Sequence, residues 1–204
     1  MPDLLRDCQG FVNAMIENSK RFSYRGQTTS QIAGNWKLFV ENAIECYHCP
    51  LIHSETFAKA FNVGNGEYES LVHSHVVTQH GDSRVTPKEL PQGRSANGFH
   101  FLFLPPSTLI GIDDFAMYAL RVVPTSPVTC EVVSDMYVDE AVPAAALEEW
   151  VTTYYAQTIQ EDVEAVERQQ AGFTSGAIPH GRLLPESENA ITFFEDWIRA
   201  RTRP

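Results

Sequence analysis

Apolar residues recur at helical spacing in several stretches of the chain. One set comprises Trp36, Phe39, Val40, Ala43, Ile44 and Tyr47. A longer set in residues 143–170 comprises Leu147, Val151, Tyr154, Tyr155, Ile159, Val163 and Val166. Two shorter sets lie in residues 4–16 and 191–200. Because a helix buries one apolar stripe with this period, the pattern predicts a helix in each of these four stretches, of which the one after residue 143 is the longest. A further short helix is expected to start at Ser54-Glu55-Thr56-Phe57 and to end by Gly66.

The middle of the chain shows the patterns typical of strands. The strand candidates are residues 69–80, 99–104, 107–112, 115–123 and 128–138. A polar loop, 81–98, follows the first candidate, and short turns rich in Pro and Asp separate the others. Short connections between strands favour antiparallel pairing. We therefore expect an α+β fold with an antiparallel sheet and a long C-terminal helix, in which residues 1–28 form a leader and residues 29–204 form one domain.

The composition is that of a globular protein. The 204 residues are 43% hydrophobic and 11% aromatic, which is enough for a substantial core. A net charge of −11 argues against nucleic acid and anionic membranes as partners. The N-terminal sequence MPDLLRDCQG lacks the basic and apolar regions of a signal peptide. These features predict a cytoplasmic protein, whose cysteines at positions 8, 46, 49 and 130 should remain thiols.

Most candidate functional residues lie in residues 35–57, whose sequence is NWKLFVENAIECYHCPLIHSETF and contains two histidines and two cysteines. Pro50 disfavours helical geometry in the residue before it, so the helix should end or kink there. Five residues of unbroken helix would turn His48 and His53 about 140° apart, so they can share a ligand only if the chain bends. The proline supplies such a bend, and the pattern therefore makes both histidines candidate ligands of one metal ion.

The long helical stripe contains one acid that could complete such a site. Asp162 falls on the apolar face, three residues after Ile159 and four before Val166. An acid facing a core is costly unless it is neutral, ion-paired or bound to a metal. Asp162 is therefore the candidate third ligand, and an ion pair with Arg168 is the alternative. The acids expected to be solvated are Glu161, Glu164 and Glu167.

The segment around the histidines resembles the iron-binding segment of the catalytic domain of Rieske non-haem iron ring-hydroxylating oxygenase α subunits. The shared features are Asn35-Trp36-Lys37, Glu41-Asn42, an acid three residues before a histidine, and a second histidine five residues later. The residues Glu45-Cys46-Tyr47-His48-Cys49-Pro50 are closer to the branch of choline, carnitine and related quaternary-amine monooxygenases than to the naphthalene dioxygenase branch. The resemblance covers about residues 30–200.

The resemblance implies a mononuclear Fe(II) site with His48, His53 and Asp162 as ligands, on a helix-grip (START/Bet v 1-like) fold that encloses a ligand cavity. It also implies an oxygenase that uses O2 to hydroxylate or N-demethylate a small organic substrate. In the family, the acid at the position of Glu45 hydrogen-bonds a ligand histidine and bridges to a Rieske-cluster histidine of a neighbouring subunit in a trimer. Glu45 and Asn42 are therefore the expected catalytic residues, with Asn42 shaping the open side of the iron.

The electrons for such a reaction should come from outside this chain. A Rieske [2Fe–2S] cluster is held by paired C-x-H and C-x2-H words. The sequence contains no such pair, and only 34 residues precede Asn35. We therefore expect Fe(II) as the cofactor, no [2Fe–2S] cluster in this chain, and a separate Rieske or ferredoxin-type electron donor. A homo-oligomer, trimeric by resemblance, is expected as well.

Zinc offers an alternative to iron. Cys46 and Cys49 are spaced C-x2-C and lie near histidines, but no second pair of this kind is present to close a tetrahedral site. A zinc hydrolase is a second possibility, in which the three ligands proposed for iron would hold zinc and Glu45 would act as the base. Either zinc protein would bind Zn2+ tightly and show no dependence on O2.

Two further alternatives place the function elsewhere. His73 and His75 share a face of the strand candidate 69–80, with His80 and His100 nearby, and these histidines could hold a metal or line a pocket. The rival of a different class is a non-catalytic helix-grip protein that binds a small apolar ligand and keeps only a vestigial metal site.

Overall fold

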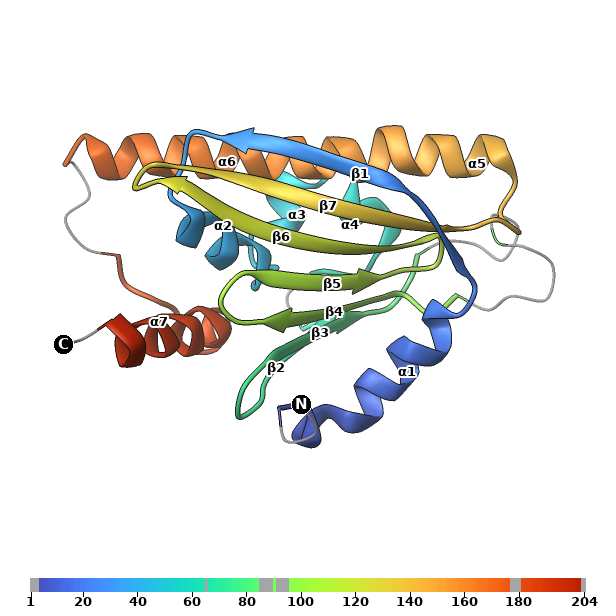
Figure 1. The fold of residues 1–204 in the computed structure, drawn as a ribbon, viewed down its shortest axis with the longest axis horizontal. Coiled ribbons are helices and arrows are strands. Elements are labelled where there is room, and N and C mark those ends of the chain that lie inside the picture. Colours follow the sequence, from blue (N-terminus) through green and yellow to red (C-terminus); the bar gives the residue numbers. More distant parts are fainter. Residues whose placement is uncertain (1–3, 65, 85–89, 91–95, 177–180, 203–204) are drawn as a thin grey trace.

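Seven antiparallel strands form one sheet in the order β1-β7-β6-β5-β4-β3-β2 (Figure 1). The protein is represented by a computed structural model that describes residues 4–202 except 65, 85–89, 91–95 and 177–180. The strands are β1 (Phe22–Ile32), β2 (Tyr68–Val72), β3 (Val77–Gly81), β4 (Phe99–Leu104), β5 (Thr108–Ile112), β6 (Ala116–Ser126) and β7 (Thr129–Asp139). Strands β2 to β7 follow one another in sequence and in space, so short connections suffice to join most of them.

Helices precede, interrupt and follow the strands. They are a short 3-10 helix (Arg6–Cys8), α1 (Gln9–Ser19), α2 (Trp36–Ala43), α3 (Cys49–Ile52), α4 (Phe57–Ala60), α5 (Ala144–Glu149), α6 (Ala156–Thr174) and α7 (Asn189–Thr202). A π-helical segment, Trp150–Tyr155, joins α5 to α6, and together they make one long rod beside the sheet (Figure 1). In the part of the chain that the structure describes, no helix is both long and apolar enough to cross a membrane.

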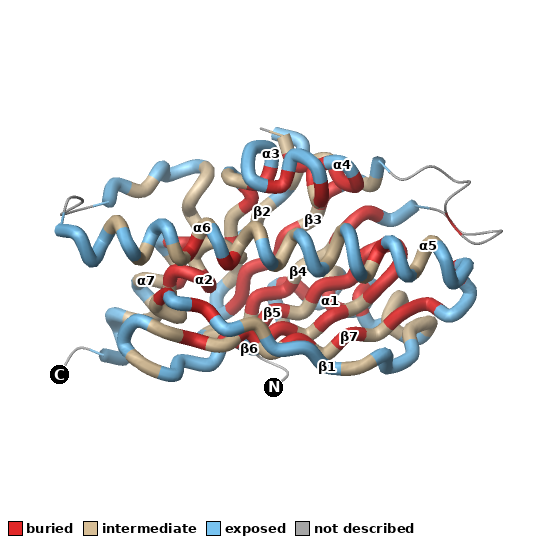
Figure 2. Tube along the Cα trace, turned by 90° about the horizontal axis from the view of Figure 1, so that it is seen from above, coloured by how far each residue is buried: buried red, intermediate tan, exposed pale blue. Residues whose placement is uncertain are grey.

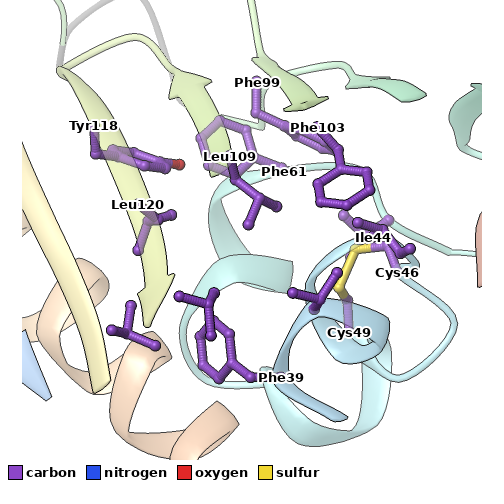
Figure 3. Close-up of a cluster of buried hydrophobic side chains, with 14 of the residues drawn as sticks. Phe39, Ile44, Cys46, Cys49, Phe61, Phe99, Phe103, Leu109, Tyr118 and Leu120 are labelled. Atoms are coloured by element: carbon purple, nitrogen blue, oxygen red, sulfur yellow. A yellow bond between two sulfur atoms is a disulfide. The ribbon is translucent and has the colours of Figure 1, made fainter. Parts of the chain in front are cut away.

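The alternation of side chains along the strands separates two cores. In β4, Phe99, Phe101 and Phe103 contribute to the main core, whereas Leu102 points to the other face. The main core lies against α2, α6 and α7, and buried residues run through the central strands (Figures 2 and 3). The smaller cluster lies under α1 and comprises Cys8, Val12, Met15, Val76, Leu102 and Ile112. The main core is the side on which the candidate ligands lie.

The predicted antiparallel sheet and long C-terminal helix are confirmed, but two strand predictions need correction. Residues 69–80 form a hairpin of β2 and β3, so His73 and His75 lie in and beside its turn, not on one strand face. The polar residues 24–29, which were assigned to the leader, belong to β1, which pairs with β7 along its length. Because most β1 side chains are exposed (Figure 2), their sequence carries no alternation. The expected boundary at residue 28 therefore falls within a strand.

The helix that carries the first apolar stripe is shorter than predicted. Asn35 caps its start by accepting a hydrogen bond from the Lys37 backbone N–H at 3.0 Å, and α2 ends at Ala43. Beyond it, the Glu45 carboxylate accepts hydrogen bonds from the backbone N–H groups of Tyr47 and His48, which competes with helix continuation. Pro50 lies in the first turn of the separate helix α3, a position that tolerates proline.

Glu41 on α2 gives this fold a measurable dependence on pH. Burial and the nearby carboxylates of Glu195 and Glu188 raise the pKa of Glu41 to about 7, although Lys37 opposes them. An acid whose pKa is higher in the folded than in the unfolded chain binds more protons when folded, so it destabilises the fold as pH rises from about 4.5 to above 7.

We expect Glu41→Gln to raise the free energy of unfolding by roughly 1 kcal/mol at pH 8, allowing for solvent screening, and by clearly less at pH 5, where the Glu41 carboxyl is still mostly protonated in the folded protein. Urea unfolding of both proteins at the two pH values measures the difference. A gain of equal size at pH 5 and pH 8 would show that the ionisation of Glu41 is not its cause.

Candidate metal centre

Three polar atoms from distant parts of the chain converge beside the main core. His48 Nε2 lies 3.1 Å from His53 Nε2, and Asp162 Oδ1 lies 3.0 Å from His53 Nε2 and 3.4 Å from His48 Nε2. His53 is 2% exposed, so its ring is almost completely removed from water. The structure therefore brings together the three side chains that the sequence predicts as metal ligands.

The local fold explains how the two histidines reach one point. Helix α3 is a single short turn, with His48 immediately before it and His53 immediately after it. The His53 backbone N–H donates to the Cys49 carbonyl at 3.0 Å, which fixes the exit from this turn. Asp162 comes from the first half of α6, which packs against both α2 and α3. A proline-started turn facing a long helix thus assembles the site.

Each histidine bonds a carboxylate through Nδ1, the ring nitrogen that does not face the centre. His48 Nδ1 lies 2.5 Å from Glu45 Oε1, and His53 Nδ1 lies 2.8 Å from Glu161 Oε2. Thr56 also donates to Glu161 Oε2 at 2.6 Å. The expectation that Glu161 is solvated is therefore wrong, because its carboxylate turns inward to an imidazole. Such a partner fixes the ring orientation and raises the basicity of a ligand histidine.

The hydrogen bonds from the two imidazoles to these carboxylates make the centre suited to a cation. When Nδ1 of each ring donates its proton to a carboxylate, Nε2 is left with a lone pair. Two such nitrogens and a carboxylate oxygen then face one another at 3.0 to 3.4 Å. Lone pairs this close repel unless a proton or a metal ion lies between them. Two imidazoles and one carboxylate form the donor set of non-haem Fe(II) sites, so the residues fit that ion.

In the absence of a metal ion, protons bound to the two histidines supply the positive charge, and the pKa values of the three ligand candidates reflect this state. Burial alone lowers the pKa of His48, but hydrogen bonds to Asp162 and Glu45 outweigh it and raise the pKa to about 10. The pKa of His53 is raised in the same way, because Asp162 and Glu161 outweigh burial. Burial raises the pKa of Asp162, but hydrogen bonds to both histidines overcome that effect and lower it. Metal ions and protons therefore compete for the same three atoms.

Asn42, the other residue predicted to act in catalysis, contacts this centre indirectly. Its side-chain amide donates to Asp162 Oδ1 at 2.6 Å from the last turn of α2. The contact ties the position of the carboxylate to the helix that begins with Asn35-Trp36. Asn42 therefore positions the acid, a role that sequence spacing alone could not reveal.

The cysteines of the C-x2-C word differ from the prediction. Cys46 and Cys49 form a disulfide bond at the edge of the main core, so the expectation that they are thiols is wrong for this pair (Figure 3). Cys8 and Cys130 are free and buried. Cys49 Sγ lies 3.9 Å from His48 Nε2, and His48, Cys49 and His53 present ligand atoms within 4.8 Å of one another. A disulfide sulfur carries no thiolate charge, however, so the carboxylate of Asp162 is the better third donor.

The histidines of the sheet do not join this centre. His73 Nε2 lies 2.9 Å from Thr78 Oγ1, and the rings of His80 and His100 lie 4.4 Å apart between centroids, tilted by 32°. Burial lowers the pKa of His100 to about 4, and the neighbouring His80 adds to the effect. His100 also contacts the ring of Phe11, so α1 packs against His100 on the other face of the sheet.

A largely apolar cavity adjoins the three ligand candidates and holds about 100 Å³ of space open to the centres of water-sized molecules. Its walls include side chains of the sheet, of α2 and of the π-helical segment. The aromatic residues among them are Phe39, Phe57, Phe101, Tyr118, Trp150, Tyr154 and Tyr155. A largely apolar wall with a few polar groups is typical of sites that bind a small organic molecule.

Curated proteins similar to this chain include carnitine monooxygenase oxygenase subunits. The carnitine monooxygenase oxygenase subunit of Acinetobacter pittii (strain PHEA-2) is 26% identical over an alignment of 181 residues, and the alignment covers 83% of this chain and 48% of the relative. The subunit of the same name from Escherichia coli (strain K12) is 26% identical over an alignment of 174 residues, which covers 79% of this chain and 44% of the relative. The chain thus spans about half the length of these relatives.

Solved structures share the fold. The quaternary ammonium Rieske monooxygenase CntA in complex with an inhibitor superimposes with a TM-score of 0.81 at 22% identity, covering 99% of this chain and 56% of that one. Dicamba monooxygenase bound to 3,6-dichlorosalicylic acid gives a TM-score of 0.61 at 14% identity, covering 87% and 58%. At these identities the likeness establishes the fold.

A family model gives the most direct assignment. The model described as the catalytic domain of the ring hydroxylating alpha subunit matches residues 19–203, which is nearly the whole chain. The match includes the segment around both histidines and the helix that carries Asp162. The chain therefore belongs to the family of ring-hydroxylating α-subunit catalytic domains.

Proposed function

We propose that this chain is the catalytic domain of an Fe(II)-dependent oxygenase, with His48, His53 and Asp162 as the iron ligands. The observation that carries the proposal is the convergence of two carboxylate-backed imidazoles and one buried carboxylate within 3.4 Å at the wall of an apolar cavity. When bound, iron of this type supplies the chemistry that activates O2. Membership of the family and the carnitine monooxygenase relatives support the proposal.

The protein residues would prepare the centre in distinct ways. Glu45 and Glu161 hold the imidazoles in the orientation that presents Nε2, and Asn42 holds Asp162. The aromatic walls exclude water and keep the reacting C–H bond of a substrate close to the ligands. The product would be a hydroxylated or N-demethylated small organic molecule.

Glu45 is also the proposed route for electrons from a Rieske or ferredoxin-type donor. Its carboxylate bonds His48, and its side chain is 10% exposed, which places the group near the surface. A solved CntA structure is described as giving insight into inter-subunit electron transfer. By analogy, we propose that this chain works in a homo-oligomer, in which a neighbouring subunit or a separate partner reaches Glu45.

We further propose that the iron site and the cavity belong to one unit with the helix-grip arrangement, in which a sheet curves around a long helix. The rod of α5, the π-helical segment and α6 beside the antiparallel sheet supports this description. The segment from residue 29 onward carries all the proposed ligands.

Hydrogen peroxide tests the proposal without the natural electron donor, because it supplies both oxygen and electrons. We expect the iron-loaded chain and peroxide to add an oxygen atom to members of a panel of small amines and aromatic compounds, detected by mass spectrometry. Asp162→Ala with the same total iron serves as the control for reactions of free iron.

A zinc hydrolase would instead bind Zn2+ tightly and yield no oxygenated product. If the chain binds iron but no member of the panel is oxygenated, the non-catalytic ligand-binding protein becomes the better explanation.

A further inference from the structure

One side-chain amide nitrogen in the cavity wall has no hydrogen-bond partner among the described residues. Gln79 on β3 is 4% exposed, and its Nε2 atom makes no hydrogen bond with any described residue. It is nevertheless one of the residues that line the cavity beside the candidate metal centre. A buried amide N–H without a partner destabilises a protein by about 1–3 kcal/mol. A bound molecule with a hydrogen-bond acceptor would therefore be stabilised at Gln79, because no described residue accepts a hydrogen bond from Nε2.

The register of the sheet explains why Gln79 faces the cavity. Gln79 pairs with Phe101 on β4, Phe101 with Gly111 on β5, and Gly111 with Tyr118 on β6. Paired residues in adjacent strands share a face of the sheet, and all four line the cavity. A Cβ atom on Gly111 would lie 2.2 Å from the Tyr118 ring and 2.9 Å from the Phe101 ring. The missing side chain thus gives both rings room beside Gln79.

The acids of the cavity wall already have partners. Glu45 bonds His48, Asp162 bonds both ligand histidines, and Asp113 Oδ1 accepts hydrogen bonds from the backbone N–H groups of Phe115 and Ala116 at 2.7 and 2.8 Å. Among the described residues that line the cavity there is neither lysine nor arginine. The two histidines of the wall are already paired with Glu45, Glu161 and Asp162. A substrate carboxylate would therefore lose its hydration without gaining a cationic partner that is not already neutralised.

We propose that the cavity selects an uncharged, apolar substrate that carries one acceptor oxygen, such as a carbonyl, and that the Gln79 side-chain amide donates a hydrogen bond to that oxygen. Gln79 is then a specificity-determining residue, and the aromatic rings of Phe101 and Tyr118 hold the apolar part of the molecule. A cation without an acceptor would leave the Gln79 amide unpaired. The inference rests on the proposed function, since it concerns the substrate of the same site.

Two probes of equal shape test the hydrogen bond. Acetophenone has a carbonyl oxygen where α-methylstyrene has a methylene group. We expect the full-length chain, titrated anaerobically in a calorimeter, to bind acetophenone about fivefold more tightly than α-methylstyrene. Gln79→Leu should abolish that preference, and Gln79→Met serves as a second variant in case leucine impairs folding. Benzoate should bind at least about tenfold more weakly than acetophenone, because the wall gives it no cationic partner.

Thr78→Val is the matched control, because Thr78 is the neighbouring residue on the opposite face of β3 and bonds His73. It should leave the ratio of the two affinities unchanged. The inference is overturned if the ratio is the same in wild type and Gln79→Leu, if benzoate or phenyltrimethylammonium binds more tightly than acetophenone, or if acetophenone does not bind. Iron content measured on the same samples separates this failure from failure of the proposed function.

Discussion

Asp162→Ala is expected to lower the affinity of the chain for Fe(II) by more than about a hundredfold, which exceeds the effect of removing an outer partner of a ligand. The variant removes the only carboxylate oxygen within 3.4 Å of both histidine Nε2 atoms among the described residues. Two neutral imidazoles alone hold a divalent ion weakly. Iron content after anaerobic loading and desalting measures the loss.

Glu164→Ala is the matched control for this prediction. Glu164 lies two residues away on the same helix, but its carboxylate faces solvent and bonds only Arg168 at 3.2 Å among the described contacts. The control should retain the iron content of the wild type, and circular dichroism should show that both variants keep the fold. Equal iron content in wild type and Asp162→Ala would refute the ligand assignment.

Glu161→Ala is expected to lower iron affinity by about 10–100-fold, although this side chain would not touch the metal. Its loss frees the His53 ring, which Glu161 Oε2 holds through Nδ1 at 2.8 Å. Glu161→Gln should restore most of the affinity, because the amide oxygen can still accept the proton of Nδ1. Competition with a chromophoric chelator gives the three affinities. If alanine and glutamine variants bind iron equally, the hydrogen bond has no positioning role.

The candidate ligands could be predicted from the sequence because each depends on a local signal. His48 and His53 flank a proline, and Asp162 interrupts an apolar stripe. Glu161 was missed for a physical reason. Glu161 lies off the apolar stripe of α6, so helical periodicity assigns it to solvent, but its carboxylate reaches His53 Nδ1 at 2.8 Å. The signal that could have identified Glu161 is its position next to Asp162, since two ligand histidines can use two neighbouring carboxylates.

The errors in the fold arise where sequence pattern carries little information. The exposed edge strand β1 has few apolar residues, and its place is set by pairing with β7, which lies about a hundred residues away in the chain. The β2–β3 hairpin was read as one strand because residues 73–76 continue the alternation through the turn. The disulfide between Cys46 and Cys49 follows from the turn between α2 and α3, which brings their Cα atoms to 5.0 Å.

The most direct test of the central claim is electron paramagnetic resonance of the chain loaded anaerobically with Fe(II) and exposed to nitric oxide. An iron site with two histidines, one carboxylate and open positions binds nitric oxide and gives a high-spin signal. We predict this signal in proportion to bound iron in the wild type and its loss in His48→Ala. A wild-type chain that binds no iron, or a His48→Ala variant with the full signal, would contradict the account.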